Sequence, residues 1–299
     1  MDKKKIILTI FVILSVFFTS CNVDTEKKTL KENQVEFDTL IVENRQYLQN
    51  DTTSPYCDLN IHFVYPINSG EMDLEMLQQL FISSTFGLSY DDFTPKEAID
   101  RYASNFLKNY EADSRVFNKE LSGLDNNTDL IAQTFNVPHE KELHPQEFYT
   151  YIETLETKIH FNKNNLLSFQ VCRTNKKGSS ASYNSFNNYV VDLESGKLVT
   201  ENDLFVAGYD VALQQLFESK LLQQNKVNTV YDLEELGYFG IEEIMPNRNF
   251  LIDEDGITYL FNKGEYSAYL LDAPEIFLPF KDVVMLLRDN TLVTELAEL

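Results

Sequence analysis

The segment from Tyr149 to Phe161 alternates apolar and polar residues with a period of two, and it constrains the fold more than any other part of the chain. One face would carry Tyr149, Tyr151, Leu155, Ile159 and Phe161, and the other Thr150, Thr154, Glu156 and Lys158. Successive side chains of a β-strand point to opposite faces, so this pattern indicates a half-buried strand. The polar turn signal at 162–165 and the apolar run LLSFQVCR after it predict a long antiparallel hairpin.

Further strands and helices are expected in separate blocks. Two early strands are predicted at 35–42 and 57–65. A hairpin is predicted from YVVDL and LVTENDLF around a turn at 194–197. A second hairpin is predicted from 249–252 and 257–261 around a turn at 253–256, and a last strand at PEIFLPF. Helices are predicted at 73–86, from Thr94-Pro95 through AIDRYASNFLKNYEA with a weaker pattern at 123–127, at 210–224, and at 282–287. The third helix would turn Val211, Leu213, Leu216, Phe217 and Leu221 inward. Hairpins rather than crossovers predict an α+β fold, with antiparallel sheets, long hairpins and helices packed on them.

The first twenty residues have the layout of a secretory signal peptide. Lys3, Lys4 and Lys5 precede an apolar run at 6–18. At about 1.5 Å per residue this run spans roughly 20 Å, too little for a bilayer core of about 30 Å. The sequence Phe-Thr-Ser-Cys at 18–21 resembles the bacterial lipobox, which predicts lipid attachment at Cys21 and a membrane anchor through that lipid. The alternative is an ordinary signal peptide with an incidental cysteine.

The chain is strongly acidic, with a net charge of −22. Residues 1–20 contain three lysines and one aspartate, so their removal leaves −24. Nucleic acid and anionic lipid would be repelled by this charge and are not expected as main partners. A basic protein or a cationic ligand fits better, and simple solubility is a further explanation. The polar residues 21–34 are expected to tether the body to the membrane.

Two cysteines remain beyond Cys21. Cys57 and Cys172 both lie in apolar, strand-like runs. Two buried thiols are the favoured interpretation, and a single disulfide between them stays open at this stage.

No motif predicts catalysis, a cofactor or a metal site. His139 and His144 are five residues apart, about 140° around a helix, and prolines flank them, so they do not form a zinc-protease helix and loop histidines are expected. Asp253–Gly256 does not align with a calcium loop and is expected to form a hairpin turn. No nucleophile elbow, phosphate-binding glycine loop or dinucleotide fingerprint is present. A glycosidase-like carboxylate pair remains an alternative, because 47 acidic residues allow many pairings.

The segment from Lys176 to Asn187 is the candidate ligand surface. It is expected to be a loop between two strands, and it combines Lys176, Lys177, Tyr183 and Phe186 with small polar residues. Loops on rigid sheets often carry recognition, and aromatic side chains supply contact area at low entropic cost. The alternative is a solvated loop without a ligand.

The order NYVVDLESGKLVTENDLF, helix, NFLIDEDGITYLFNKGEYSAY, PEIFLPF resembles the secreted bacterial domain of unknown function 3298. The preceding LNIHFVYP, helix and long hairpin resemble its usual partner domain, which is 4163-like. The same pair occurs outside the membrane in lysozyme-sensing anti-sigma factors and in the N-terminal region of peptidoglycan deacetylases. Many relatives carry a glycine-rich segment with a histidine before NYVVDL, whereas this chain has KGSSAS at 177–182, so that histidine's role is not transferred.

Added to the signal peptide at 1–20 and the tether at 21–34, the resemblance implies an N-terminal domain at 35–188 and a C-terminal domain at 189–299, with one continuous body as the alternative. The lipobox and the resemblance together predict a lipid-anchored protein of the cell envelope, in the outer membrane, that binds or senses a ligand without catalysis. A lysozyme-like protein or a peptidoglycan fragment is the implied ligand. An envelope hydrolase acting on glycan and a structural lipoprotein are the alternatives.

Overall fold

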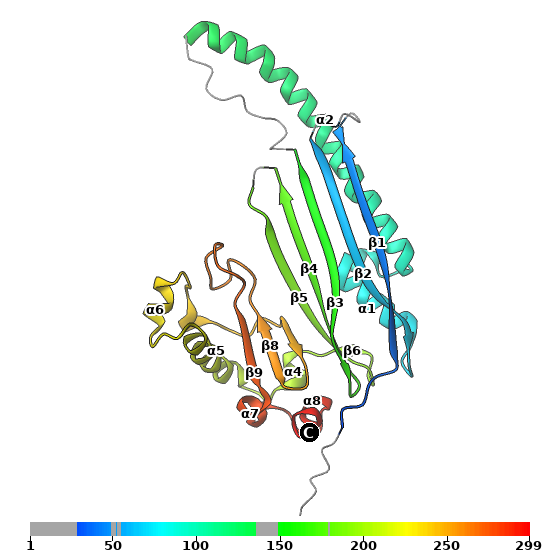
Figure 1. Cartoon of the computed structure of the whole chain (residues 1–299), viewed down its shortest axis with the longest axis vertical. Coiled ribbons are helices and arrows are strands. Elements are labelled where there is room, and N and C mark those ends of the chain that lie inside the picture. Colours follow the sequence, from blue (N-terminus) through cyan, green and yellow to red (C-terminus); the bar gives the residue numbers. More distant parts are fainter. Residues whose placement is uncertain (1–28, 49–51, 53–54, 136–148, 179) are drawn as a thin grey trace, which may run out of the picture.

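A computed structural model describes residues 29–48, 52, 55–135, 149–178 and 180–299, and of residues 116–135 only the backbone. Cys21, His139 and His144 lie outside these residues. Among the residues described, no helix is both long and apolar enough to cross a membrane. The fold is α+β, as predicted (Figure 1).

A six-stranded sheet in the order β1-β2-β3-β4-β5-β6 is the main element. Its strands are β1 (Val35–Tyr47), β2 (Tyr56–Ser69), β3 (Tyr151–Lys163), β4 (Leu166–Lys177), β5 (Tyr183–Asp192) and β6 (Lys197–Leu198). The predicted hairpin is β3–β4, which turns at Asn164 and Asn165, both with positive φ. β2 and β3 are parallel, however, so the expectation that only hairpins connect the strands is wrong. Parallel neighbours require a crossover, and helices form part of it here.

The crossover contains α1 (Leu74–Phe86), the short η2 (Leu88–Tyr90) and α2 (Pro95–Phe135). Asp73 caps α1 by accepting a hydrogen bond from the Met76 N–H, and Gly87 ends it, as predicted. Pro95 begins α2, also as predicted, but the helix continues through the polar stretch at 123–127 to Phe135. Both helices contact β2, on the same face of the sheet. In the core beneath them Phe81 stacks on Phe169, with ring centroids 4.1 Å apart.

A β-bulge divides the apolar face of β3 between two cores. Pairing shifts from Ile159–Phe169 to Phe161–Ser168, which leaves His160 unpaired. One extra residue reverses the side on which later side chains point. Leu155 and Ile159 therefore pack beneath α1 and α2, whereas Phe161 packs in the C-terminal core. The prediction that all three share one face is wrong for Phe161.

The C-terminal part forms a small sheet covered by helices, near the lower end of β4 and β5 in Figure 1. Its strands β7 (Phe250–Ile252), β8 (Gly256–Leu260) and β9 (Glu275–Pro279) pair antiparallel, and the turn at 253–256 is confirmed. The helices are α4 (Glu201–Leu204), α5 (Tyr209–Asn225), α6 (Val230–Glu235), η3 (Ile241–Glu243), α7 (Phe280–Val283), η4 (Val284–Leu286) and α8 (Leu292–Ala297).

Two predictions for this part need correction. Val211 of α5 is 56% exposed, whereas Leu213, Phe217 and Leu221 are buried. The final helix is not the one expected at 282–287, because α8 follows it. The division into two domains after residue 188 stays a prediction; residue 188 itself lies in β5 of the large sheet.

The two cysteines of the body are unpaired thiols. Cys57 is fully buried, and its burial raises the pKa of the thiol to about 11. Cys172 lies in β4 opposite Glu156 and is partly exposed. Two free thiols agree with the favoured interpretation, although only Cys57 is buried.

Candidate functional site

A cleft of about 450 Å³ lies between the large sheet and the small sheet, and we take this inter-sheet cleft as the candidate functional site. Its floor is the face of β3, β4 and β5 that points away from α1 and α2. Its wall comes from β7, β8 and the segment 263–275. The lining residues are His160, Gln170, Asn184, Phe186, Asn188, Leu251, Ile252, Asp253, Thr258, Leu260, Lys263, Asp272, Ala273 and Glu275.

The floor exists because cross-strand partners on one face of a sheet lie side by side. Gln170 is directly opposite Asn188, and Cys172 is directly opposite Phe186. The Gln170 amide donates a hydrogen bond of 2.9 Å to the Asn188 Oδ1 atom. The floor is therefore amide-rich, with one aromatic ring.

Asn188 has an unused donor. Its side chain is only 6% exposed, and its Nδ2 atom has no hydrogen-bond partner. Buried polar groups are almost always paired, because an unpaired one costs about 1–3 kcal/mol. An N–H group left without a partner beside a cleft is suited to donate to an acceptor oxygen of a ligand.

Two asparagines hold the wall against β5. The backbone N–H of Phe186 donates to Asn262 Oδ1 at 2.7 Å, and that of Asn188 donates to Asn249 Oδ1 at 2.8 Å. Both asparagine amides donate back to the Phe186 carbonyl oxygen. In this stretch side-chain amides take the place of a neighbouring strand, so the edge of β5 is occupied and the wall is bound to the floor.

The charged side chains of the cleft stand mainly on its wall. Asp253, Asp272 and Glu275 supply carboxylates, and Lys263 lies 3.8 Å from Asp272. Desolvation, followed by the charge of Lys158, lowers the pKa of His160, so its ring is neutral at pH 7 and one nitrogen can accept a hydrogen bond. Within the described ranges, no three His, Cys, Asp or Glu side chains gather as a metal site.

The structure separates the four predicted surface residues. The strands are longer than expected, so Lys176, Lys177, Tyr183 and Phe186 lie in β4 and β5, and the predicted loop shortens to residues 178–182. Phe186 lines the cleft. The Tyr183 ring lies 6.3 Å from that of Tyr269, at the start of β5.

The two lysines do not join the cleft. Lys177 is 3.3 Å from Asp113 of α2, and its ammonium lies 4.5 Å from the Tyr151 ring centroid. Lys176 is exposed opposite Ile152 of β3. Gln170, Asn188 and His160 were not predicted as site residues. His160 and Gln170 share the polar face of the β3–β4 hairpin, a signal that could have found them, whereas Asn188 lies in β5, outside that hairpin.

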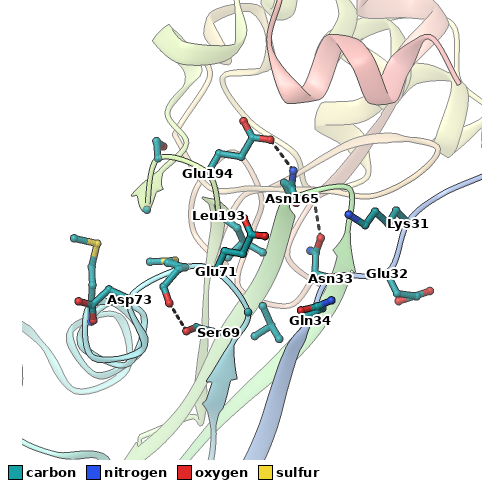
Figure 2. A pocket seen from close by; sticks show the side chains of 16 residues that line it. Lys31, Glu32, Asn33, Gln34, Ser69, Glu71, Asp73, Asn165, Leu193 and Glu194 are labelled. Atoms are coloured by element: carbon teal, nitrogen blue, oxygen red, sulfur yellow. Dashed lines mark hydrogen bonds between the residues drawn. The ribbon is translucent and has the colours of Figure 1, made fainter.

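A second, open pocket of about 600 Å³ lies where the N-terminal segment meets the sheet (Figure 2). Here Asn33 accepts a hydrogen bond of 2.7 Å from the Asn165 N–H and donates to Asn162 Oδ1 and to the Leu166 carbonyl. Glu32 forms a bridge with Lys163. The last residues of the predicted tether are thus bound to the β3–β4 turn, which gives this region a structural role.

Comparison with known proteins identifies part of the chain. Residues 202–281 match DUF3298, a protein family of unknown function. A DUF3298 family member from Bacteroides fragilis NCTC 9343 is similar in structure, with a TM-score of 0.74 at 25% sequence identity over 90% of this chain and 100% of that chain. A DUF3298 family protein from Pseudomonas aeruginosa PAO1 shares the fold, with a TM-score of 0.58 at 12% identity over 87% of this chain and 97% of that chain. No curated protein matches the chain. The expected resemblance in the C-terminal part is confirmed, and the partner domain remains a prediction.

Proposed function

We propose that this protein is a lipid-anchored, non-catalytic binding module of the cell envelope, and that its ligand is a glycan fragment bound in the inter-sheet cleft. The buried, unpartnered Nδ2 donor of Asn188 carries the proposal. It lies in the floor beside Phe186, Gln170 and Asn184.

The composition of the cleft suits a saccharide. Amides and carboxylates form hydrogen bonds with hydroxyl and acetamido groups, and the ring of Phe186 can cover the apolar face of a sugar ring. About 450 Å³ is within the usual range for small-ligand sites. Peptidoglycan, the glycan of the bacterial envelope, is the natural source of such a ligand.

Anchoring supports the same function. Lipid on Cys21 would be separated by nine residues from Leu30, which packs against the C-terminal core, and nine residues span at most about 32 Å. Such a tether keeps the body close to a membrane surface, where an envelope glycan is within reach. The outer membrane of a Gram-negative cell is the proposed location.

A basic, lysozyme-like protein is the second candidate ligand. The net charge of −24 that remains after removal of residues 1–20 favours it, because complementary charge accelerates the encounter of two proteins. An envelope hydrolase and a structural lipoprotein are the remaining alternatives, and the following experiment separates them.

The experiment is a calorimetric titration of the soluble body, residues 27–299, with soluble muropeptides at 20 and 150 mM NaCl. We expect saturable binding at both salt concentrations, since the contacts in the cleft are largely uncharged. Asn188→Leu removes the donor while keeping a similar volume, and it should weaken binding about tenfold. Glu218→Gln on α5, outside the residues that line the cleft, is the matched control and should bind as the wild type does.

Each alternative has its own outcome. Release of shortened glycan during the titration would show a hydrolase. Absence of binding at both salt concentrations would refute the glycan proposal, and binding that disappears at 150 mM NaCl would show only charge attraction.

A further inference from the structure

Strand β1 has one unpaired edge. It is the first strand in the order of the large sheet, and among the residues that the structure describes it pairs only with β2 along its thirteen residues. In Figure 1 it forms the right-hand edge of that sheet. An edge strand presents a row of N–H and C=O groups that can bind a further strand, and proteins usually keep such edges short or cover them. The edge of β1 is long for a strand in this position.

The register with β2 decides which backbone groups of β1 point outward. The Leu48 N–H donates to the carbonyl oxygen of Pro55, directly opposite, at 2.9 Å. Antiparallel partners alternate between hydrogen-bonded and non-hydrogen-bonded pairs, so the even-numbered residues at 38–48 bond β2 and the odd-numbered residues point their N–H and C=O groups outward. Within the described ranges, the outward groups at 41–45 have no hydrogen-bond partner.

The middle of this edge is apolar on both faces of the sheet. Leu40 and Val42 pack against the core beneath α1 and α2 and are only partly buried. Ile41 points to the opposite face, because side chains alternate along a strand, and it is 57% exposed. The segment 39–42 carries no charge. A strand added to this edge would cover the exposed parts of all three apolar side chains.

We propose that the edge of β1 binds the same edge of a second copy of this chain, so that two large sheets join into one across a two-fold axis at Ile41. A two-fold axis perpendicular to the sheet makes the two strands antiparallel and uses the same surface of both copies. Ile41 then faces Ile41 of the partner subunit in a hydrogen-bonded pair, and Leu40 faces Val42 of the partner subunit.

The sequence around Ile41 selects this register. No two like charges face each other in it, since the further opposed pairs are Thr39 with Glu43, Asp38 with Asn44, and Phe37 with Arg45. Moving the axis by one residue in either direction places a carboxylate opposite an apolar side chain. Moving it by two residues to Glu43 places two carboxylates opposite each other. The edge therefore matches its own reverse, which favours a second copy over an unrelated strand.

The dimer leaves the inter-sheet cleft uncovered. The floor of the cleft is on β3, β4 and β5, and β1 lies at the opposite edge of the sheet. The inference therefore stands whether or not the cleft binds a glycan.

Disulfide trapping tests the position of the axis. The parent is the full-length protein with Cys172→Ser, in detergent at 150 mM NaCl, and single cysteines are introduced and oxidised mildly. Opposed Cα atoms of a hydrogen-bonded pair lie about 5.5 Å apart, which suits a disulfide. Ile41→Cys should therefore form a covalent dimer. Thr39→Cys and Glu43→Cys should each stay monomeric alone, because like positions would be roughly 13 Å apart, and should cross-link to each other when mixed.

Ile41→Lys tests the contact without a covalent bond. It places two ammonium groups opposite each other at a position that is exposed in the monomer, so the fold should be kept and dimerisation should weaken at least tenfold. Sedimentation velocity over a concentration series measures the change. The matched control is Val211→Lys on α5, which is 56% exposed and should dimerise as the wild type does.

The inference is overturned by a wild type that stays monomeric up to about 200 μM, by Ile41→Cys that cross-links no more than the parent, or by Glu43→Cys that cross-links alone as well as Ile41→Cys does. Equal dimerisation of Ile41→Lys and the wild type would also overturn it. Muropeptide titration of Ile41→Lys separates this inference from the proposed function, because Ile41 does not line the cleft and muropeptide affinity should be unchanged.

Discussion

At the scale of single residues, Gly256 shows how a close approach between backbones selects glycine. A Cβ atom at this position would lie 2.3 Å from the Leu278 carbonyl oxygen and 2.9 Å from the Pro279 Cα atom. These are backbone atoms of β9, and they cannot move without breaking the pairing of β8 with β9. We expect Gly256→Ala to lower the free energy of unfolding by about 3 kcal/mol.

The control is Gly208→Ala. Gly208 has a positive φ of 84°, and nothing lies within 4 Å of a Cβ atom there, so this change should cost only about 1 kcal/mol. Urea unfolding of both variants gives the comparison. Equal losses would mean that β9 yields to the added methyl group and that the close approach is not restrictive.

Single residues also show how much of the candidate site could be predicted from the sequence. Phe186 could be chosen from the sequence, because an aromatic residue in a polar stretch is conspicuous. Asn188 could not, since asparagine is frequent in this chain and its burial depends on Asn249, about sixty residues away. A hydrogen bond between residues this far apart leaves no repeating pattern in the sequence.

At the scale of elements, the short helix α4 depends on its capping interaction. The Thr200 N–H donates to Asp203 Oδ2 at 2.8 Å, and the Thr200 hydroxyl donates to the same atom at 2.6 Å. These hydrogen bonds lower the pKa of Asp203 below its ordinary value of 3.8. Because the folded-state pKa is depressed, the stabilisation is present above about pH 4 and disappears as the pH falls through the lower folded value.

Asp203→Asn should therefore lower the free energy of unfolding by roughly 0.5 kcal/mol at pH 7, a small amount because the carboxylate is mostly exposed. The difference from the wild type should shrink below about pH 4 in urea titrations, as Asp203 becomes protonated. Asp289→Asn, at an exposed position, is the control and should lose clearly less stability than Asp203→Asn. If Asp203→Asn lost the same amount of unfolding free energy at every pH, the capping role assigned to the Asp203 carboxylate would be contradicted.

Elements with a strong local signal were predictable. The β3–β4 hairpin follows from alternation, and the starts of α1 and α2 follow from caps. The parallel pairing of β2 with β3 was not predictable, because its partners are about ninety residues apart and the intervening helices give no sign of direction. The bulge at His160 was missed because an added residue in a strand leaves the local composition unchanged.

At the scale of the whole molecule, the fold directs the N-terminal segment to one end of the large sheet. Asn33 and Glu32 bind the β3–β4 turn and Leu30 packs against the C-terminal core, so the tether leaves the body before Leu30, near the pocket in Figure 2. The inter-sheet cleft opens between β5 and the small sheet. A lipid at Cys21 would therefore hold the molecule by one end and leave the cleft free.

Cys21→Ser tests this arrangement in cells. The serine hydroxyl cannot take the place of the thiol that receives the diacylglyceryl group, so metabolic labelling with radioactive palmitate should fall to background, and the protein should leave the membrane fraction. Cys172→Ser, in the folded body, is the matched control and should keep both the label and the location. Because the cleft would not contact the membrane, the unlipidated protein should bind its glycan ligand with unchanged affinity. Persistent labelling of Cys21→Ser would refute the lipid anchor, and lost ligand binding would show that the membrane forms part of the site.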